Sequence, residues 1–316
     1  SILFNTHADV VPAPKSQFEP IVKNEVIYGR GACDAKGQIA TLFLLFCFLK
    51  KSGFRFKGDI IIHIVIEEEN GGNGTLAAIR KGEMADAAIV MEPSSLKILP
   101  SVRGAVWFRV ITKGQPGHSG SGGKRISALD LAIEAKEILS DYHKKLLAES
   151  RGIPLFDEYE NPMPITFGKL HAGDWPATIP NQGILEGVLG FLPNKTRFQV
   201  MEEIRQEIHQ YGSNELIENC DLEFMYRHDA HVLPVDHSFV TTLSESCKKT
   251  GVPIEITAMV ASCDSWFYNN QLKIPTVVFG AGDLAVAHSN HEHIKIKELE
   301  LASEMLFNFL NDWCNQ

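Results

Sequence analysis

Short β-branched runs alternate with longer apolar segments at both ends of this chain, and few fold classes accommodate that order. Residues 59–66 (DIIIHIVI), 87–91 (AAIVM) and 276–279 (TVVF) have the composition of buried strands. Residues 37–49 (GQIATLFLLFCFL) and 296–313 are long enough to form helices. Strands that alternate with helices predict an α/β fold, in which helices flank a mixed, partly parallel sheet.

The pattern changes in the middle of the chain. Strands are predicted there at residues 105–112, 183–191 and 222–226, and amphipathic helices at 126–144 and 198–211. The earlier alternation resumes after His228. We therefore predict a discontinuous catalytic domain formed by residues 1–103 and 228–316, with residues 104–227 as an inserted α+β domain. A chain of 316 residues is long enough for this division.

The composition is that of ordinary globular protein and argues against several function classes. Hydrophobic residues make up 44% of the chain and charged residues 22%. The formal net charge of −9 argues against a nucleic-acid surface, which needs clustered lysine and arginine. No apolar run approaches the roughly 20 residues of a membrane-spanning helix. We therefore expect neither nucleic acid nor a membrane as a partner.

Two further features bear on the setting of the protein. The 6 cysteines are scattered without a CxxC pair, which favours reduced thiols and a cytoplasmic location over a disulfide framework. The first residues, SILFNTHADVV, already read as a buried strand. Because chain termini usually lie at the surface, we expect further residues to precede Ser1 in the natural protein.

Histidine and carboxylate residues are concentrated in a few short segments. These are THAD (His7, Asp9), GACDAKG (Asp34), IEEENGGNG (Glu67, Glu68, Glu69), VMEPSS (Glu92) and VAHSNHEH (His288, His291, Glu292, His293). His7, the glutamate run and Glu92 each follow an apolar strand, so we expect them at one edge of a sheet. Imidazole nitrogens and carboxylate oxygens are ligands that zinc accepts. The segments together predict a metal site.

Each segment is a weak signal by itself. A histidine after a strand is more often a satisfied loop residue, and three consecutive glutamates more often form a solvated turn. The combination is stronger, because a charge at the end of a buried strand is costly unless it is paired or bound to metal.

The ordered motifs HADVV, GRGACDAKG, EEENGGNG, MEPSS, PGHSG and FGAGDLAVAH resemble those of the dinuclear zinc amidohydrolases and metallopeptidases. That family includes acetylornithine deacetylase, succinyl-diaminopimelate desuccinylase, aminoacylase and glutamate carboxypeptidase. The resemblance covers essentially the whole chain. It implies two divalent metal ions, with zinc as the first choice of element and cobalt as the second. It also implies that residues 104–227 form a lid and dimerisation domain.

The resemblance also implies individual roles. Asp34 resembles the carboxylate that bridges both ions; His7 and Glu92 resemble the other ligands of one ion, and Glu69 and His288 those of the other. Asp9 resembles the carboxylate that orients His7, and Glu68 resembles the general base.

Several residues in or near these motifs have a simpler interpretation. Counting back from Gly71–Gly72 in the motif makes Glu67 the first, non-catalytic position of the glutamate run, where a surface carboxylate is favoured. His291 and His293 are interpreted as surface residues, and His63, inside a strand, as a satisfied core histidine. No motif supports a role for His228 or His231.

The predicted inserted domain carries one further candidate, and the chain departs from the family pattern at several positions. His118, in PGHSG, resembles the residue that donates a hydrogen bond to the tetrahedral oxyanion across the interface of a homodimer. Trp266 stands where many relatives carry an arginine, and Ala177–Thr178 precede Ile179–Pro180 where asparagine is common. Arg103 and Arg125 are therefore only generic candidates for binding a substrate carboxylate.

The favoured function is metal-dependent hydrolysis of an amide bond, with deacylation of a small N-acyl amino acid. A dipeptidase or carboxypeptidase with the same metal site is the first alternative. An alternative of another class is a catalytically silent binding protein on this fold; against it, every expected ligand position and Glu68 are filled.

Overall fold

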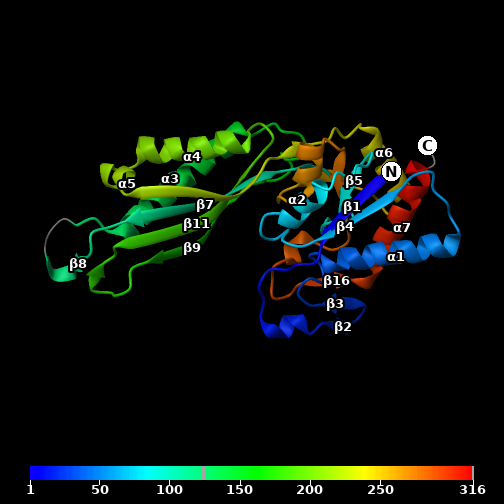
Figure 1. The fold of residues 1–316 in the computed structure, drawn as a ribbon, viewed down its shortest axis with the longest axis horizontal. Coiled ribbons are helices and arrows are strands. Elements are labelled where there is room, and N and C mark those ends of the chain that lie inside the picture. The colour runs from blue at the N-terminus through cyan, green and yellow to red at the C-terminus, as the bar shows by residue number, and fades with distance from the viewer. Residues whose placement is uncertain (122–124, 315–316) are drawn as a thin grey trace. The chain divides into compact units, whose positions relative to one another are not determined.

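The central sheet of the first structural unit is interrupted in sequence by a second unit (Figure 1). The computed structural model describes residues 1–121 and 125–314. The first unit comprises Ser1–Val102, His231–Met259 and the chain from Cys263 onward. The second comprises Arg103–Ala230, together with Val260–Ser262 from the returning chain.

Among the described residues, seven strands form the sheet of the first unit. They are β1 (Ile2–His7), β4 (Ile60–Val65), β5 (Ala88–Val90), β6 (Ile98–Val102), β13 (His231–Val232), β14 (Ile256–Met259) and β15 (Thr276–Val278). Their order is β13-β6-β15-β5-β1-β4, with β14 also paired to β6. Strands β4, β1, β5 and β15 are parallel, whereas β15 and β6 are antiparallel. The prediction of a mixed sheet in an α/β fold is confirmed.

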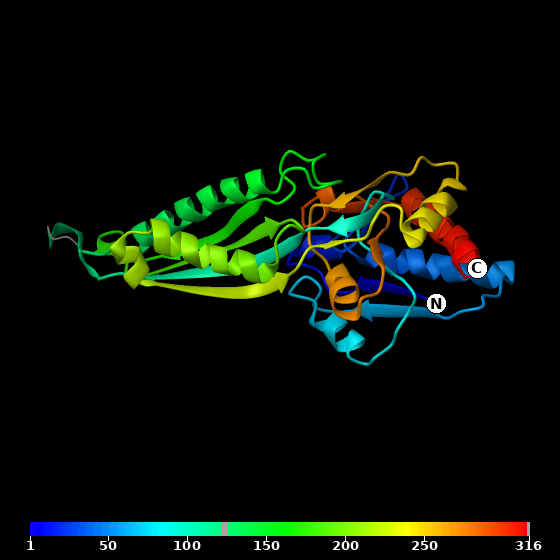
Figure 2. The same ribbon diagram turned by 90° about the horizontal axis from the view of Figure 1, so that it is seen from above.

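Helices cover both faces of this sheet, which explains why β1 reads as a continuous apolar run. All six residues of β1 are buried. Helices α1 (Lys36–Ser52), α6 (Ser238–Lys248) and α7 (Ile296–Trp313) pack together on one face. Helix α2 (Asn73–Ile79) and the π-helix η3 (Phe267–Leu272) lie on the other (Figure 2). The core between the sheet and α1, α6 and α7 contains Phe4, Leu45, Ile89 and Phe309, each fully buried.

A small antiparallel sheet lies beside the main one and was not predicted. It consists of β2 (Ile21–Lys23), β3 (Val26–Tyr28) and β16 (His293–Lys295), in the order β16-β3-β2. Strand β3 leads into the loop that carries Asp34, and β16 follows the segment that carries His288. Pairing of β3 with β16 therefore brings two distant motifs together. The short 3-10 helices η1 (Lys15–Phe18) and η4 (Leu284–Val286) lie in the connections nearby.

The second unit is an antiparallel sheet covered by helices. Strands β7 (Gly104–Lys113), β9 (Ile165–Ala172), β11 (Gln182–Phe191) and β12 (Cys220–His228) pair in the order β12-β7-β11-β9. Helices α3 (Ala128–Glu149) and α4 (Arg197–Tyr211) pack on this sheet, and α5 (Asn214–Glu218) contacts both helices. A separate ribbon pairs β8 (Gly117–His118) with β10 (Thr178–Ile179), and the 3-10 helix η2 (Ser119–Ser121) follows β8. No helix among the described residues is both long and apolar enough to cross a bilayer.

Candidate metal centre

Three neighbouring parallel strands deliver polar side chains to one edge of the main sheet. Strands β5, β1 and β4 are adjacent and run in the same direction. His7 is the last residue of β1, Glu92 lies just after β5, and the glutamate run lies just after β4. The three segments therefore meet at the same edge, as the sequence pattern predicted.

His7 is buried and faces carboxylates with both ring nitrogens. Its Nδ1 lies 3.1 Å from the carbonyl oxygen of Asp9 and 3.3 Å from Asp9 Oδ1. Its Nε2 lies 2.9 Å from Asp34 Oδ1 and 3.8 Å from Glu92 Oε2. A neutral imidazole carries one N–H. If Nδ1 holds that proton, the Nε2 lone pair is directed at two carboxylates, and a cation between them would satisfy all three groups.

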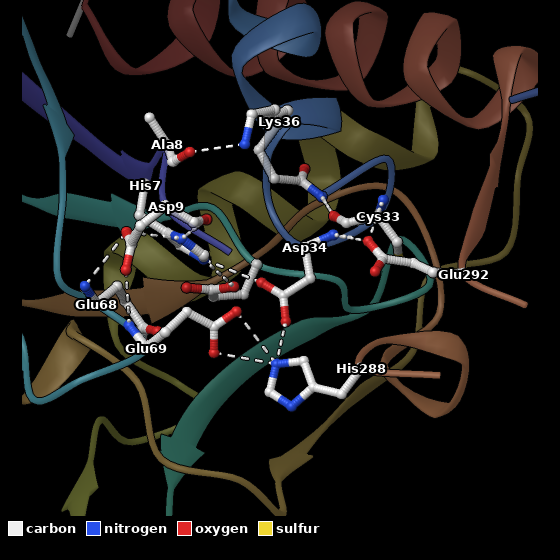
Figure 3. A network of polar contacts seen from close by, with 12 residues as sticks. His7, Ala8, Asp9, Cys33, Asp34, Lys36, Glu68, Glu69, His288 and Glu292 are labelled. Atoms are coloured by element: carbon white, nitrogen blue, oxygen red, sulfur yellow. Dashed lines mark hydrogen bonds and ion pairs between the residues drawn. The ribbon is translucent and has the colours of Figure 1, made fainter. Parts of the chain in front are cut away.

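His288 completes a second set of contacts around Asp34 (Figure 3). His288 Nε2 lies 3.1 Å from Asp34 Oδ2 and 3.0 Å from Glu69 Oε2. Asp34 therefore contacts His7 through one carboxylate oxygen and His288 through the other. The side chain of His288 is 52% exposed whereas that of Asp34 is 9% exposed, so the His288 side of the site is the more open one.

Asp9 connects the end of β1 to the glutamate run. Its Oδ1 accepts the backbone N–H of Glu68 at 3.4 Å, and its Oδ2 accepts that of Glu69 at 3.3 Å. The same carboxylate approaches Nδ1 of His7. One side chain therefore restrains both the imidazole and the backbone of the turn that carries Glu68 and Glu69.

The remaining carboxylates are crowded and incompletely paired. Burial raises the pKa of Glu92 to about 7; Asp34 and Glu69 add to the rise, and His7 opposes it. Burial also raises the pKa of Glu68, with Glu92 as a further cause. Oε1 of Glu92 is buried without a hydrogen-bond partner among the described residues. A bound cation would offset this excess of negative charge and would contact the free lone pair of Glu92 Oε1.

The donor atoms divide into two overlapping groups that fit metal ions. His7, Asp34 and Glu69 offer ligand atoms within 4.8 Å of one another, and so do His7, Glu68 and Glu92. All the donors are imidazole nitrogens or carboxylate oxygens, the types that zinc and cobalt accept. The carboxylate of Glu68 thus lies on the His7–Glu92 side, and that of Glu69 contacts His288.

Two polar groups near the site were not predicted from the sequence. Glu292 is buried, forms an ion pair with Arg30 at 2.5 Å, and accepts the backbone N–H of Asp34 at 3.1 Å. Asp264 is fully buried and accepts the hydroxyl of Thr75 at 2.5 Å. Burial is the main cause that raises the pKa of Asp264 to about 7. The only sequence signal for Arg30 and Glu292 is that each is a charged residue inside a motif segment, GRGACDAKG and VAHSNHEH respectively.

The other histidines of the first unit have structural contacts. His63 lies between the hydroxyl of Tyr268 and Glu83 Oε2, each at 2.9 Å, which confirms its interpretation as a satisfied core residue. His231 is buried with Nε2 at 2.8 Å from Ser265 Oγ, and burial lowers its pKa to about 3. His291 is exposed and His293 partly exposed, in agreement with their interpretation as surface residues.

His118, Arg103 and Arg125 all lie in the second unit. His118 is in β8 and its Nδ1 accepts the backbone N–H of Gly120 at 3.0 Å. It is not among the residues that the contacts above bring together, so its role stays a prediction. Arg103 donates to the carbonyl oxygens of Val260 and Gly104, and Arg125 donates to that of Pro116. Both arginines are thus already engaged with backbone carbonyls.

The fold and the site together define a metal-dependent hydrolase of amide bonds. In agreement with this, the model of the Peptidase family M20/M25/M40 matches residues 3–312, and the chain belongs to that family. The resemblance inferred from the ordered motifs is thereby confirmed.

Several individual proteins are similar to this chain. The chain is 28% identical to the N-formyl-4-amino-5-aminomethyl-2-methylpyrimidine deformylase of Bacillus subtilis (strain 168), over 100% of this chain and 80% of that protein. It is 24% identical to the [LysW]-lysine/[LysW]-ornithine hydrolase of Sulfurisphaera tokodaii, over 99% and 81%. Among solved structures, the di-peptidase Dug1p of Saccharomyces cerevisiae has the same fold, with a TM-score of 0.81 at 15% identity, covering 100% of this chain and 80% of that one.

Proposed function

We propose that the protein deacylates a small N-acyl amino acid or a closely related amide, with two divalent cations bound around Asp34. The observation that carries this proposal is the position of Asp34, whose two carboxylate oxygens contact the imidazoles of His7 and His288. His7 and Glu92 complete one ligand set, and Glu69 and His288 complete the other. Zinc is the expected ion and cobalt the second choice, because the donors are nitrogen and oxygen.

The bound cations would supply the positive charge that polarises an amide carbonyl and makes the attacking water more acidic. The protein contributes the proton transfers. Glu68 is the proposed base, since its carboxylate is grouped with His7 and Glu92 and burial raises its pKa well above the usual value of a glutamate. It would take the proton of the water and deliver it to the leaving amine. Asp9 would keep the proton of His7 on Nδ1, leaving Nε2 free to bind metal.

The names of the sequence relatives favour deacylation over peptide cleavage. The Bacillus subtilis relative is named as a deformylase and the Sulfurisphaera tokodaii relative as a hydrolase of a lysine or ornithine conjugate. Neither name is that of a dipeptidase or carboxypeptidase. A dipeptidase with the same metal site is the alternative, and the substrate itself distinguishes the two.

Two further parts of the proposal concern the assembly and the setting. The second unit would form a C2 homodimer and present His118 as the donor to the tetrahedral oxyanion. The cysteines are all unpaired thiols, including the exposed Cys47, which supports a reducing compartment such as the cytoplasm.

The proposal predicts that hydrolysis depends on added metal and on an N-acyl substrate. Protein stripped with a chelator should be inactive, and zinc or cobalt should restore release of the free amine from N-formyl, N-acetyl or N-succinyl amino acids. Dipeptides at the same concentration serve as the comparison set, and a His7→Ala variant controls for activity that does not need the site. If added metal restored the cleavage of dipeptides alone, the proposal of a deacylase would be wrong and that of a dipeptidase would stand.

A further inference from the structure

Glu292 has an unusual environment for a carboxylate. Its side chain and that of Arg30 are 0% and 2% exposed, and they form an ion pair at 2.5 Å. Its other oxygen, Oε1, accepts the backbone N–H groups of Cys33 and Asp34, both at 3.1 Å (Figure 3). A buried, negatively charged acceptor forms stronger hydrogen bonds with backbone N–H groups than a neutral one does. The carboxylate therefore restrains the peptide units from which the Asp34 side chain projects.

The same residue connects the two chain segments that meet at the site. Glu292 lies in the segment that begins with His288, whereas Arg30 and Asp34 lie in the loop after β3. The backbone N–H of Gly29 donates to the carbonyl oxygen of Glu292 at 3.1 Å. Gln17 adds a second link, because its side chain donates to the carbonyl oxygen of Ser289 at 3.0 Å and its backbone carbonyl accepts the N–H of Arg30 at 2.8 Å.

Fold stability alone gives little reason to bury this pair. Removing two charges from water is costly, and well-packed apolar side chains often replace a buried ion pair without loss of stability. Apolar side chains, however, could not accept the N–H groups of Cys33 and Asp34. What the charged pair adds is a defined position for the backbone at Asp34 relative to the His288 segment.

We propose that Glu292, held by Arg30, is a positioning residue that sets the metal affinity of the site by fixing Asp34 relative to His288. This inference rests on the proposed function, because it assumes that Asp34 and His288 bind metal. Partners outside the direct ligands typically change metal affinity by about 10–100-fold when they are removed. Glu292 touches neither ion in this scheme and acts only through the backbone of Asp34.

The test is a titration of the metal-free protein with Zn²⁺ alone, followed by calorimetry or by competition with a coloured chelator. Glu292→Gln keeps the shape of the side chain but removes its charge and leaves Arg30 unpaired. The double variant Arg30→Met/Glu292→Gln removes both charges, and it decides the outcome if the single variant does not fold. In each folded variant we expect the Kd of at least one zinc ion to rise about 10–100-fold.

Asp312→Asn is the matched control. Asp312 forms an ion pair with Lys249 and accepts the hydroxyl of Ser246, both between α6 and α7 and away from the ligand segments. This variant should lower the thermal unfolding temperature of the metal-free protein and leave the zinc Kd unchanged. Folded Glu292 variants whose zinc Kd lies within about twofold of that of the natural chain would overturn the inference. A natural chain that binds no zinc would instead refute the metal pair itself, and the inference with it.

Discussion

The three consecutive glutamates that follow strand β4, Glu67, Glu68 and Glu69, lie in three different environments. Glu67 is exposed, has a φ of 66°, and accepts the side-chain amide of Asn73 at 3.1 Å. Glu68 is grouped with His7 and Glu92, and burial raises its pKa. Glu69 contacts His288 at 3.0 Å. Chemically identical neighbours can therefore differ in role, because the turn directs each carboxylate to a different place.

This difference predicts opposite outcomes for two isosteric substitutions. Glu68→Gln should lower kcat by about 10²–10⁴-fold, because an amide cannot accept the proton of the attacking water. The stoichiometry of bound metal should remain that of the natural chain. Glu67→Gln is the matched control and should retain nearly full turnover. Steady-state kinetics together with metal analysis distinguishes the cases; an active Glu68→Gln beside an inactive Glu67→Gln would show that the roles are exchanged.

At the residue scale, the sequence indicated the side chains that lie in short motifs. The predicted ligands are His7, Asp34, Glu69, Glu92 and His288. In the structure His7 contacts Asp34 and Glu92, and His288 contacts Asp34 and Glu69. The contact between Arg30 and Glu292 was not foreseen. These residues are 262 positions apart, and only the pairing of β3 with β16 explains why they meet. Contacts of this kind depend on tertiary structure that no local pattern contains.

At the scale of elements, the turn between β4 and α2 positions the glutamates. The N–H of Gly72 donates to the carbonyl oxygen of Glu67 at 2.6 Å and closes the turn. Gly72 has a φ of 74°, a conformation that side chains with a Cβ rarely adopt. A Cβ there would lie 2.2 Å from Cε2 of Phe267 and 2.4 Å from Oδ1 of Asp264. The turn is therefore packed directly against η3 and the segment before it.

Gly72→Ala should lower the free energy of unfolding of the metal-free protein by about 2–5 kcal/mol, from backbone strain and the clash with Phe267 together. Gly82→Ala is the matched control. Gly82 has a φ of 83°, but apart from its two chain neighbours no described residue has an atom within 4 Å of the added Cβ. Gly82→Ala should lower the free energy of unfolding by only about 1 kcal/mol. Urea unfolding measures both values, and equal losses would show that the packing against η3 is unimportant.

Elements with strong periodicity were predicted well, and weakly patterned ones were missed. The predicted helices at residues 37–49 and 296–313 correspond to α1 and α7, and the predicted strand at 59–66 corresponds to β4. Strand β6 was not predicted, because Pro100 interrupts a short run that otherwise reads as a loop. Strand β9 contains Gly168 and has mostly exposed residues, so neither a buried run nor an alternation marks it.

At the scale of the whole molecule, the division of labour between the two units is testable. Because His118 and Glu68 belong to different units, one active site can draw on two subunits of the proposed dimer. Mixing inactive His118→Ala with inactive Glu68→Gln subunits should then restore one intact site in each mixed dimer. At equal amounts and random exchange, we expect about a quarter of the natural activity. Absence of recovery, with subunit exchange shown by differential labelling, would place His118 in the same subunit or outside the reaction.

The interrupted sheet also has a consequence for biosynthesis. Strand β5 pairs with β15, and β6 pairs with β13 and β14, yet Arg103–Ala230 must be translated between them. At a translation rate of roughly 5–20 residues per second, β5 and β6 remain without these partners for many seconds during synthesis. The second unit is almost continuous in sequence and can complete its own sheet during that interval. Because His288 and Glu292 follow the second unit in sequence, the nascent chain can bring the proposed ligand segments together only after that whole unit has been translated.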